Sequence, residues 1–488
     1  MGSFRDYTEK GPFVLLGMQF FGIITVSIFL KETLYMSQLE RFDNRIYHRK
    51  ILAIGIPVVF QNFIVIGLNL IDTLMIGKLG EEPLAAIGVA NQVYFIFSVS
   101  LFGFLSGSAV YTTQYFGAGR RDGVKMMLGI SLISSLTLAL LFVLVTYTFA
   151  PEIIGLFSQS HEVIGFGARY LRIACFSYLF CAVSMVISYK SRAVQDLNGV
   201  TVINFIALCV NAVLNYILIY GKFGAPAMGV SGAALATLIA RIFEAVSVWI
   251  FIQTKKTHWL RGKIKEYFSF DRKLFKGVMK MALPVMVTES IWSGSMALIF
   301  AAYGLLGTAA LATAQIANVV TEMLQSFYFG VGNSTAMIIG EYVGKKELDI
   351  AYECGKKAMR LTWILNLVLG VLLILIAKPI TGFYDFNEDT NALIVRTIIV
   401  MAVVMAPKMI AYMYIVGILR AGGDTVFCMK LEFVFTMLLQ VPTAFFGVLV
   451  LKLSLPGVIA LSAVIEITRI FIVRKRFRSG IWLNEVIQ

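Results

Sequence analysis

The sequence predicts an all-α protein that crosses a membrane many times and is built from two parallel six-helix repeats. Low charge, long apolar runs and an internal repeat predict this fold. Of the 488 residues, 58% are hydrophobic and 14% are charged, whereas soluble chains carry about 25% charged residues. The chain has too little polar surface to cover a soluble globule, so we expect a polytopic membrane protein.

Twelve apolar runs are long enough to cross the bilayer core, which takes a helix of about 20 mostly apolar residues. The first six runs are 51–77, 86–115, 124–150, 163–189, 197–220 and 228–253. The second six runs are 279–303, 312–342, 357–382, 391–418, 427–450 and 456–476. They predict five parts of the chain: an N-terminal extension with a hydrophobic segment (1–45), an N-lobe (46–253), a linker (254–278), a C-lobe (279–478) and a tail (479–488).

The apolar segment 11–30 is also long enough to span a membrane and contains no charged residue. No convincing cleavage site of small residues follows it. Three interpretations stay open: a thirteenth helix, an uncleaved signal-like anchor, and an upstream extension from a misassigned start, with translation beginning at Met36.

Basic residues gather in the segments on one side of the membrane. Lys and Arg are frequent in 254–280, 345–357 and 474–478, whereas the loop 385–391 on the other side is acidic. Because cytoplasmic loops carry the excess of Lys and Arg, we expect a multi-pass plasma-membrane protein with both ends of its twelve-helix core in the cytoplasm. The net charge of +14 therefore reflects topology, and we expect no nucleic-acid partner.

The composition also excludes several kinds of site. The five cysteines are scattered within apolar runs, with no Cys-x-x-Cys or Cys/His cluster, so we expect neither disulfides nor a metal site. No Gly-Lys-Ser/Thr phosphate loop occurs, so ATP is not the expected energy source. No nucleophile–base set is recognisable. We therefore predict that the protein is not an enzyme and has no catalytic residues and no cofactor. The expected coupling ion is H+ or Na+.

The two halves of the chain match when the sequence is shifted by 227 residues. The matched pairs include Pro57 and Pro284, Gly80 and Gly307, Gly103 and Gly330, and Gly117 and Gly344. With one more residue of shift they include Arg192 and Arg420, Asp196 and Asp424, and Arg241 and Arg469. Each repeat holds an even number of spans, so the repeats are parallel. Transporters built in this way bind substrate near the midplane, between two rocking lobes.

Several short segments carry a resemblance to a known family. They are "IDTLMIGKLGEEPLAAIGVA" (71–90), "NAVLNYILIYG" (211–221), "MGVSGAALAT" (228–237), and the paired turns "LRAGGDT" (419–425) and "SRAVQDL" (191–197). Together they resemble the multidrug and toxic compound extrusion (MATE) family over residues 45–478. The resemblance implies a twelve-helix, V-shaped, two-lobed antiporter that expels bulky, often cationic amphiphiles in exchange for protons or sodium.

The resemblance also implies roles for carboxylates. Asp72 matches the family's N-lobe acid, but Asn215 stands where one branch of the family has a second acid. Glu289 matches a C-lobe acid of another branch, whereas Lys408 stands near the place of its partner acid. These departures argue against a coupling site of two acids in either lobe.

The predicted ion-coupling site consists of Asp72, Asn211 and Asn215. A charge in the bilayer core costs at least roughly 2.5–3.5 kcal/mol on insertion scales, so Asp72 is expected to serve a function. Asn211 and Asn215 lie one helical turn apart and can both bind Asp72; alternatively, they are polar contacts that only join helices. A carboxyl group removed from water takes up a proton more readily, which slightly favours H+ over Na+.

The predicted substrate site consists of Glu289, Trp292, Lys408, Asn69 and Gln61. Trp292 follows Glu289 on the same helix face, and a carboxylate beside an aromatic ring attracts an organic cation. Alternatively, Glu289 and Lys408 form an internal ion pair, because an ionisable residue inside a membrane usually has a partner. Asn69 and Gln61 belong to the polar side of the first span.

The matched turns have a structural interpretation. Asp196 and Asp424 stand where helices begin, and an Asp at such a position caps the helix. The Arg four residues before each of them, Arg192 or Arg420, is then expected to pair with it.

These observations predict a secondary active multidrug antiporter that exports organic cations or amphiphilic compounds in exchange for H+ or Na+. We expect a monomer in the lipid bilayer that binds drug-like small molecules. A flippase for lipid-linked sugars or lipids of the same superfamily is an alternative, which Lys408 favours because such cavities are more basic. A membrane-embedded enzyme or a channel is a further alternative, but no motif supports either.

Overall fold

The computed structural model describes residues 43–158, 160–382 and 386–487, without the side chains of residues 64, 66 and 68–71. All regular secondary structure in these ranges is helical, as predicted. The apolar segment 11–30 lies outside the described residues.

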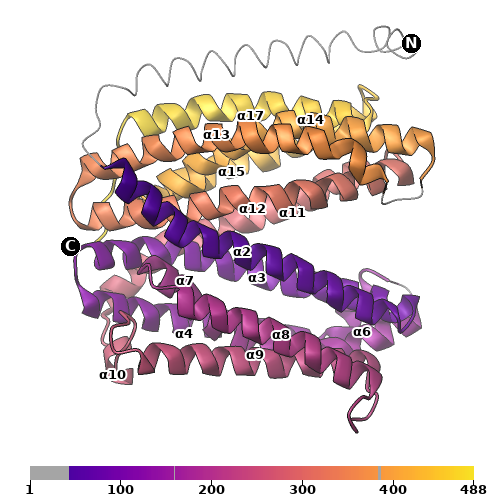
Figure 1. The fold of residues 1–488 in the computed structure, drawn as a ribbon, viewed down its shortest axis with the longest axis horizontal. Helices are drawn as coiled ribbons and strands as arrows, with labels where there is room; N and C mark the ends of the chain where they lie inside the picture. The colour runs from indigo at the N-terminus through magenta and orange to yellow at the C-terminus, as the bar shows by residue number, and fades with distance from the viewer. Residues whose placement is uncertain (1–42, 159, 383–385, 488) are drawn as a thin grey trace.

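The first repeat folds into the helices of the N-lobe (Figure 1). They are α2 (Asn44–Gly77), α3 (Glu81–Gly117), α4 (Arg121–Thr148), the short α5 (Ala150–Gly155), α6 (His161–Ala174), α7 (Ser177–Ala193), α8 (Asn198–Tyr220) and α9 (Gly229–Thr254). α6 and α7 are bent by 51° at a short break and together form the fourth predicted span.

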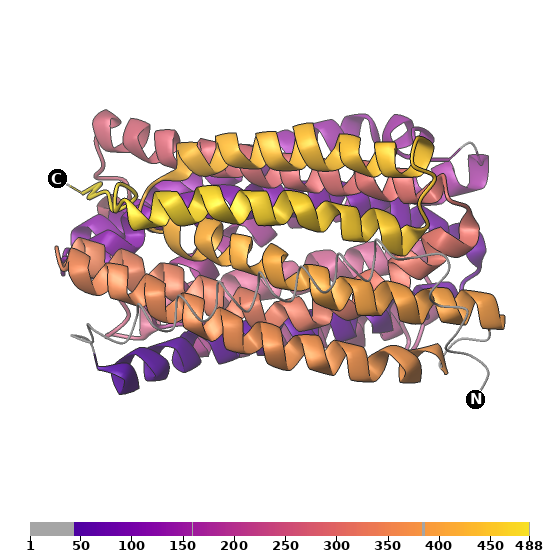
Figure 2. The ribbon, with the colours of Figure 1, turned by 90° about the horizontal axis from the view of Figure 1, so that it is seen from above.

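The second repeat folds into the C-lobe, after the short linker helix α10 (Ile264–Tyr267). Its helices are α11 (Arg272–Gly304), α12 (Thr308–Gly344), α13 (Leu348–Thr381), α14 (Glu388–Tyr412), η2 (Met413–Leu419), α15 (Thr425–Glu432), η3 (Phe433–Gln440), α16 (Val441–Leu449) and α17 (Leu455–Arg478). α14 runs on into the π-helix η2, and α15 runs on through the π-helix η3 into α16. Figure 2 shows the long orange and yellow helices of this lobe side by side.

Nine of the described helices are long and apolar enough to cross a membrane, and the bent pair α6–α7 makes ten. α12 reaches 37 residues, about 55 Å at 1.5 Å per residue, and is more polar because part of it faces the space between the lobes. α2, with 34 residues, occupies the first predicted span. Each predicted span therefore corresponds to one helix, to one continuous helical run or, for the fourth span, to the bent pair α6–α7.

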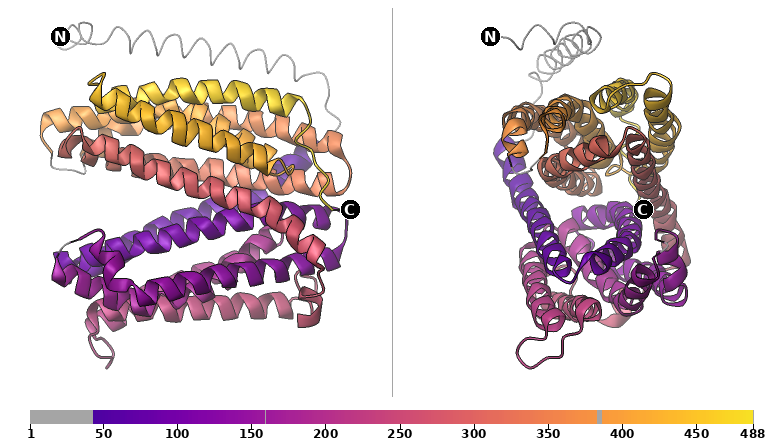
Figure 3. Two further views of the ribbon diagram at one scale, coloured as in Figure 1. Left: turned by 180° about the vertical axis from the view of Figure 1, so that it is seen from behind. Right: turned by 90° about the vertical axis from the view of Figure 1, so that its right-hand side faces the viewer.

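The two lobes form a V whose closed end carries the C-terminus (Figure 3). Near that end α3 crosses α11, α2 crosses α12, and α3 also contacts α12. At the contact between α3 and α12 the backbones approach so closely that only glycine fits. A Cβ atom at Gly117 would lie 1.9 Å from the carbonyl oxygen of Glu341, and one at its repeat mate Gly344 would lie 2.1 Å from the carbonyl oxygen of Gln114. The lobes diverge from these crossings toward the other end.

The segment after α17 joins the two lobes at the closed end. Trp482 is fully buried in the C-lobe, and the backbone amide of Asn484 donates to the carbonyl of Gly422 at 2.8 Å. On the N-lobe side, the Gln114 side chain donates to the carbonyl of Asn484 and accepts from the amide of Val486, both at 2.8 Å. The predicted tail is therefore a clasp held by both lobes.

Gln114→Ala should weaken this clasp. The change removes two hydrogen bonds, each of which contributes about 0.5–1.5 kcal/mol, so we expect the melting temperature of the purified protein to fall by a few degrees. Asn198→Ala is the control, because Asn198 is exposed and stands at the same end of the molecule. Equal melting temperatures for the two variants would show that the clasp does not stabilise the closed end.

Candidate functional site

A cleft of about 470 Å³ lies between the lobes and is lined by side chains from both. Four of the five predicted substrate residues line it: Gln61 from α2, Glu289 and Trp292 from α11, and Lys408 from α14. The fifth, Asn69, lies on α2, and its side chain is outside the described set. The repeat thus places polar side chains of matching helices on the two facing walls of one cleft.

The three predicted ion-coupling residues line a second cavity, of about 420 Å³, inside the N-lobe. The Asn215 side chain donates to Oδ1 of Asp72 at 2.8 Å. When the Asn211 amide is oriented to satisfy its neighbours, its nitrogen donates to Oδ2 of Asp72 at 3.2 Å. Because Asn211 and Asn215 stand one turn apart on α8, which packs against α2, they hold both oxygens of the carboxylate with neutral donors.

Arg241 and Glu244 line both cavities and connect them. They stand one turn apart on α9, and Nη1 of Arg241 lies 2.7 Å from Oε2 of Glu244. Nη2 of Arg241 donates to the hydroxyl of Tyr94 at 3.2 Å. This ion pair therefore forms part of the wall of both cavities.

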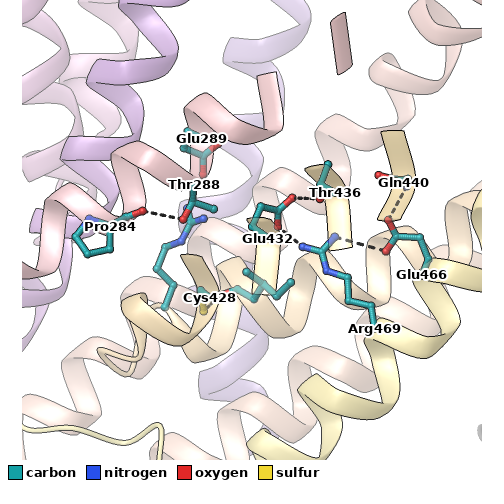
Figure 4. A network of polar contacts seen from close by, with 11 residues as sticks. Pro284, Thr288, Glu289, Cys428, Glu432, Thr436, Gln440, Glu466 and Arg469 are labelled. Atoms are coloured by element: carbon teal, nitrogen blue, oxygen red, sulfur yellow. Dashed lines mark hydrogen bonds and ion pairs between the residues drawn. The ribbon is translucent and has the colours of Figure 1, made fainter. Parts of the chain in front are cut away.

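The repeat mate of Arg241, Arg469 on α17, lies between two acids in the C-lobe wall of the cleft (Figure 4). It forms an ion pair with Glu432 and lies 3.6 Å from Glu466. Thr436 donates to Glu432 at 2.6 Å, and Gln440 donates to Glu466 at 3.1 Å. The π-helix η3 carries Thr436 and Gln440 on the side that faces α17, so both acids have polar partners.

The sequence reasoning missed the acids of these networks, Glu244, Glu432 and Glu466. One signal was available: Arg241 and Arg469 are matched by the repeat, and each has a glutamate three residues away on the same helix face. An arginine and a glutamate so placed inside an apolar run indicate a buried ion pair.

The predicted pair of Glu289 and Lys408 is wrong. Oε1 of Glu289 lies 2.8 Å from Nη1 of Arg420 instead. Glu289 stands where α11 crosses α3, with its Cγ 3.0 Å from the Cβ position of Gly103. Arg420 reaches that level from the closed end, whereas Lys408 lies roughly 18 Å further along the same helical run at 1.5 Å per residue.

The predicted pairing within the matched turns is also wrong. Asp424 makes no capping hydrogen bond and instead accepts from Nε of Arg476 at 2.6 Å. Asp196 accepts from Lys255 at 2.7 Å. Both aspartates thus bind basic residues at the closed end of the molecule, while the arginines of the same turns line the cleft.

Within the described residues, no group of three or more His, Cys, Asp or Glu side chains could hold a metal ion. The glutamates of the cleft all lie against arginines, and in the N-lobe cavity the carboxylate of Asp72 lies between two amides. This arrangement can bind a polar organic molecule and exchange a small ion.

Comparison of the sequence with known proteins gives matches over most of the chain. A family model described as MatE matches residues 57–217 and 284–446, one match in each repeat. The chain is 23% identical over 416 residues to an uncharacterized transporter of Bacillus subtilis, YisQ, which covers 85% of this chain and 90% of that protein. It is 24% identical over 379 residues to a probable multidrug resistance protein of Neisseria meningitidis serogroup B, NorM, over 76% of this chain and 81% of that protein.

The fold is similar to those of solved transporters. A MOP superfamily transporter from Pyrococcus furiosus, described as having a binding pocket of reverse polarity, superposes with a TM-score of 0.80 at 19% identity, over 89% of this chain and 96% of that chain. A multidrug resistance MATE family transporter in an outward-facing conformation superposes with a TM-score of 0.81 at 19% identity, over 89% and 97%. These structures share the two-lobed fold.

A double-mutant cycle on Glu289 and Arg420 should reveal their pairing. Glu289→Gln alone and Arg420→Gln alone each leave a buried charge without its partner, which costs about 3–5 kcal/mol, so both should lower the melting temperature strongly. The double variant should recover much of this loss. A cycle of Glu289→Gln with Lys408→Met is the control and should be additive; additive effects in the first cycle would contradict the pairing.

Proposed function

Because the chain belongs to the MATE family of multidrug efflux transporters, we propose that it is a secondary antiporter that exports amphiphilic organic compounds in exchange for protons. The observation that carries the proposal is the carboxylate of Asp72, held by two amides in a cavity next to the cleft. The compound would occupy the cleft, and Asp72 would carry the proton.

Asp72 is suited to exchange because no basic side chain in the described part of the chain forms an ion pair with it. No Lys or Arg nitrogen of the described residues lies within 4.0 Å of its carboxylate, whereas Glu244 nearby is paired with Arg241. The amides of Asn211 and Asn215 position the carboxyl group in either protonation state. A group so placed can bind a proton at one stage of a cycle and release it at another.

The geometry favours a proton over sodium. Asn215 presents its amide nitrogen to Asp72, and Asn211 does so in the orientation that satisfies its neighbours; a nitrogen that bears hydrogens cannot coordinate a cation. Sodium would need both amides to turn their oxygens inward and further oxygen ligands around them.

The residues shared by the two cavities support coupling between proton binding and substrate binding. Arg241 and Glu244 line both, so protonation of Asp72 changes the field that the shared ion pair experiences. Proton and substrate would then favour opposite orientations of the lobes, which is what antiport requires.

We further propose that the protein acts as a monomer in the plasma membrane, with the closed end of the V and its basic segments in the cytoplasm. The excess of Lys and Arg at that end supports this orientation. In the present structure the cleft would then face outward.

The expectation of organic cations as substrates loses its main support in the structure. It depended on a free carboxylate at Glu289, which Arg420 neutralises. A flippase for a lipid with an anionic headgroup is the second candidate, favoured by the basic side chains that line the cleft: Arg192, Arg241, Lys408, Arg420 and Arg469. Export of water-soluble dyes would favour the antiporter over the flippase.

Asp72→Asn should abolish proton-driven transport. The isosteric amide keeps the size of the side chain and cannot take up the proton, so transport of rhodamine B by proteoliposomes under an imposed pH gradient should fall to background. Expression and melting temperature should stay close to those of the wild type.

Asp122→Asn is the matched control, because the Asp122 side chain is 93% exposed and lies outside both cavities. Wild-type transport in Asp72→Asn would refute the proton role of Asp72. Transport by the wild type that responds to a sodium gradient and ignores a pH gradient would identify sodium as the coupling ion.

A further inference from the structure

Two arginines that the repeat matches converge at the closed end of the cleft. Arg192 lies at the end of α7 in the N-lobe, and Arg420 follows η2 in the C-lobe. Arg192 donates to Asn333 of the C-lobe at 3.5 Å, and Arg420 donates to Ser106 of the N-lobe at 3.4 Å. Ser106 and Asn333 are also repeat mates, 227 residues apart. Each arginine thus reaches the opposite lobe through an equivalent contact.

The charges of the two arginines are balanced differently. Arg420 has the carboxylate of Glu289 at 2.8 Å. The residue that matches Glu289 in the first repeat is Asn62, which lines the same cleft and has no charge. No carboxylate of the described residues lies within 4.0 Å of the Arg192 guanidinium. One positive charge is therefore left over at this end of the cleft, and it belongs to Arg192.

The remaining acids of the cleft do not balance Arg192. Glu244 is paired with Arg241, and Glu432 and Glu466 both lie against Arg469. The cleft is lined by five basic side chains and four glutamates, and each of the four glutamates lies against an arginine other than Arg192.

Arg192 is buried, and one of its donor atoms has no acceptor among the described residues. The residue is 7% exposed, its guanidinium lies 4.8 Å from the ring centre of Tyr189, and its Nε is buried without a hydrogen-bond partner. A buried charged donor without an acceptor is destabilising, so an acceptor from a ligand would be stabilising there.

We propose that Arg192 binds an acidic group of the transported compound, so that the substrates are amphiphiles with a carboxylate, sulfonate or phosphate group, either anionic or zwitterionic. The proposal rests on the export function proposed above. The planar fork of an arginine binds such groups through two parallel hydrogen bonds. The aromatic rings of Trp292 and Phe329, which line the same cleft, offer surface for the apolar body of the molecule.

Rhodamine B and its ethyl ester test this proposal, because both carry the same cationic ring system and differ by one carboxylate. Their dissociation constants are measured by fluorescence anisotropy with the purified full-length protein in detergent. We expect the wild type to bind rhodamine B about tenfold or more tightly than the ester, since hydrogen bonds to charged groups are among the strongest in proteins. Arg192→Gln should remove this preference and leave the affinity for the ester within about twofold of the wild-type value.

Arg192→Lys should retain part of the preference, because it keeps the charge and loses the fork. Arg169→Gln is the matched control, since Arg169 is exposed on α6 and should leave both constants unchanged. Equal affinities of the wild type for the two dyes would overturn the proposal. A parallel loss of both affinities in Arg192→Gln would also overturn it, because it would show a purely structural role.

The binding measurement tests the site at Arg192 independently of the proposed transport function. If the wild type prefers rhodamine B and Asp72→Asn still transports it, the antiport mechanism fails and the acidic-group site stands. If Asp72→Asn stops transport while the wild type binds both dyes equally, the antiporter stands and the site at Arg192 fails.

Discussion

The cost of removing charge from water is the constraint on which the interior of this protein depends. A single charge in a bilayer core costs at least roughly 2.5–3.5 kcal/mol, yet the cleft is lined by several arginines and glutamates. The pairs that offset this cost are Arg241 with Glu244, Arg420 with Glu289, and Arg469 with Glu432 and Glu466. Both partners of every pair belong to the same lobe. Each lobe can therefore move as a rigid body without separating a buried charge from its partner.

The contacts between the lobes are of a different kind. They consist of close backbone crossings at glycines, long hydrogen bonds such as that from Arg192 to Asn333 at 3.5 Å, and the clasp after α17. The ion pair between Lys50 of α2 and Glu341 of α12, at 2.6 Å, also joins the lobes. Glu341 has a second partner within the C-lobe, Lys345 at 2.5 Å, so the contact with Lys50 can break without leaving this buried carboxylate unpaired. Contacts of this kind can break and re-form at modest cost, as alternation of the cleft between the two sides requires.

The sequence predicts the helical framework well, because the lengths of the apolar runs and the internal repeat are properties of the sequence itself. It also predicts the cluster of Asp72, Asn211 and Asn215. Two amides one turn apart lie on the same helix face, so both can contact an acid on the neighbouring helix. The partner of Glu289 could not be predicted in this way. Glu289 pairs with Arg420 and not with Lys408 because of how far along α11 the helices cross. The composition of the sequence does not contain this information.

The two repeats differ in the charges that they place inside the protein. Asn62 and Asn204 in the N-lobe match Glu289 and Glu432 in the C-lobe, whereas Asp72 matches the apolar Ile299. The C-lobe thus holds its acids in arginine pairs, and the N-lobe holds one acid between neutral amides. The carboxylate of Glu289 is bound by the guanidinium of Arg420, whereas that of Asp72 is bound by amides. The first repeat has the neutral Asn62 where the second has Glu289, and Arg192 therefore lacks the carboxylate partner that its repeat mate Arg420 has.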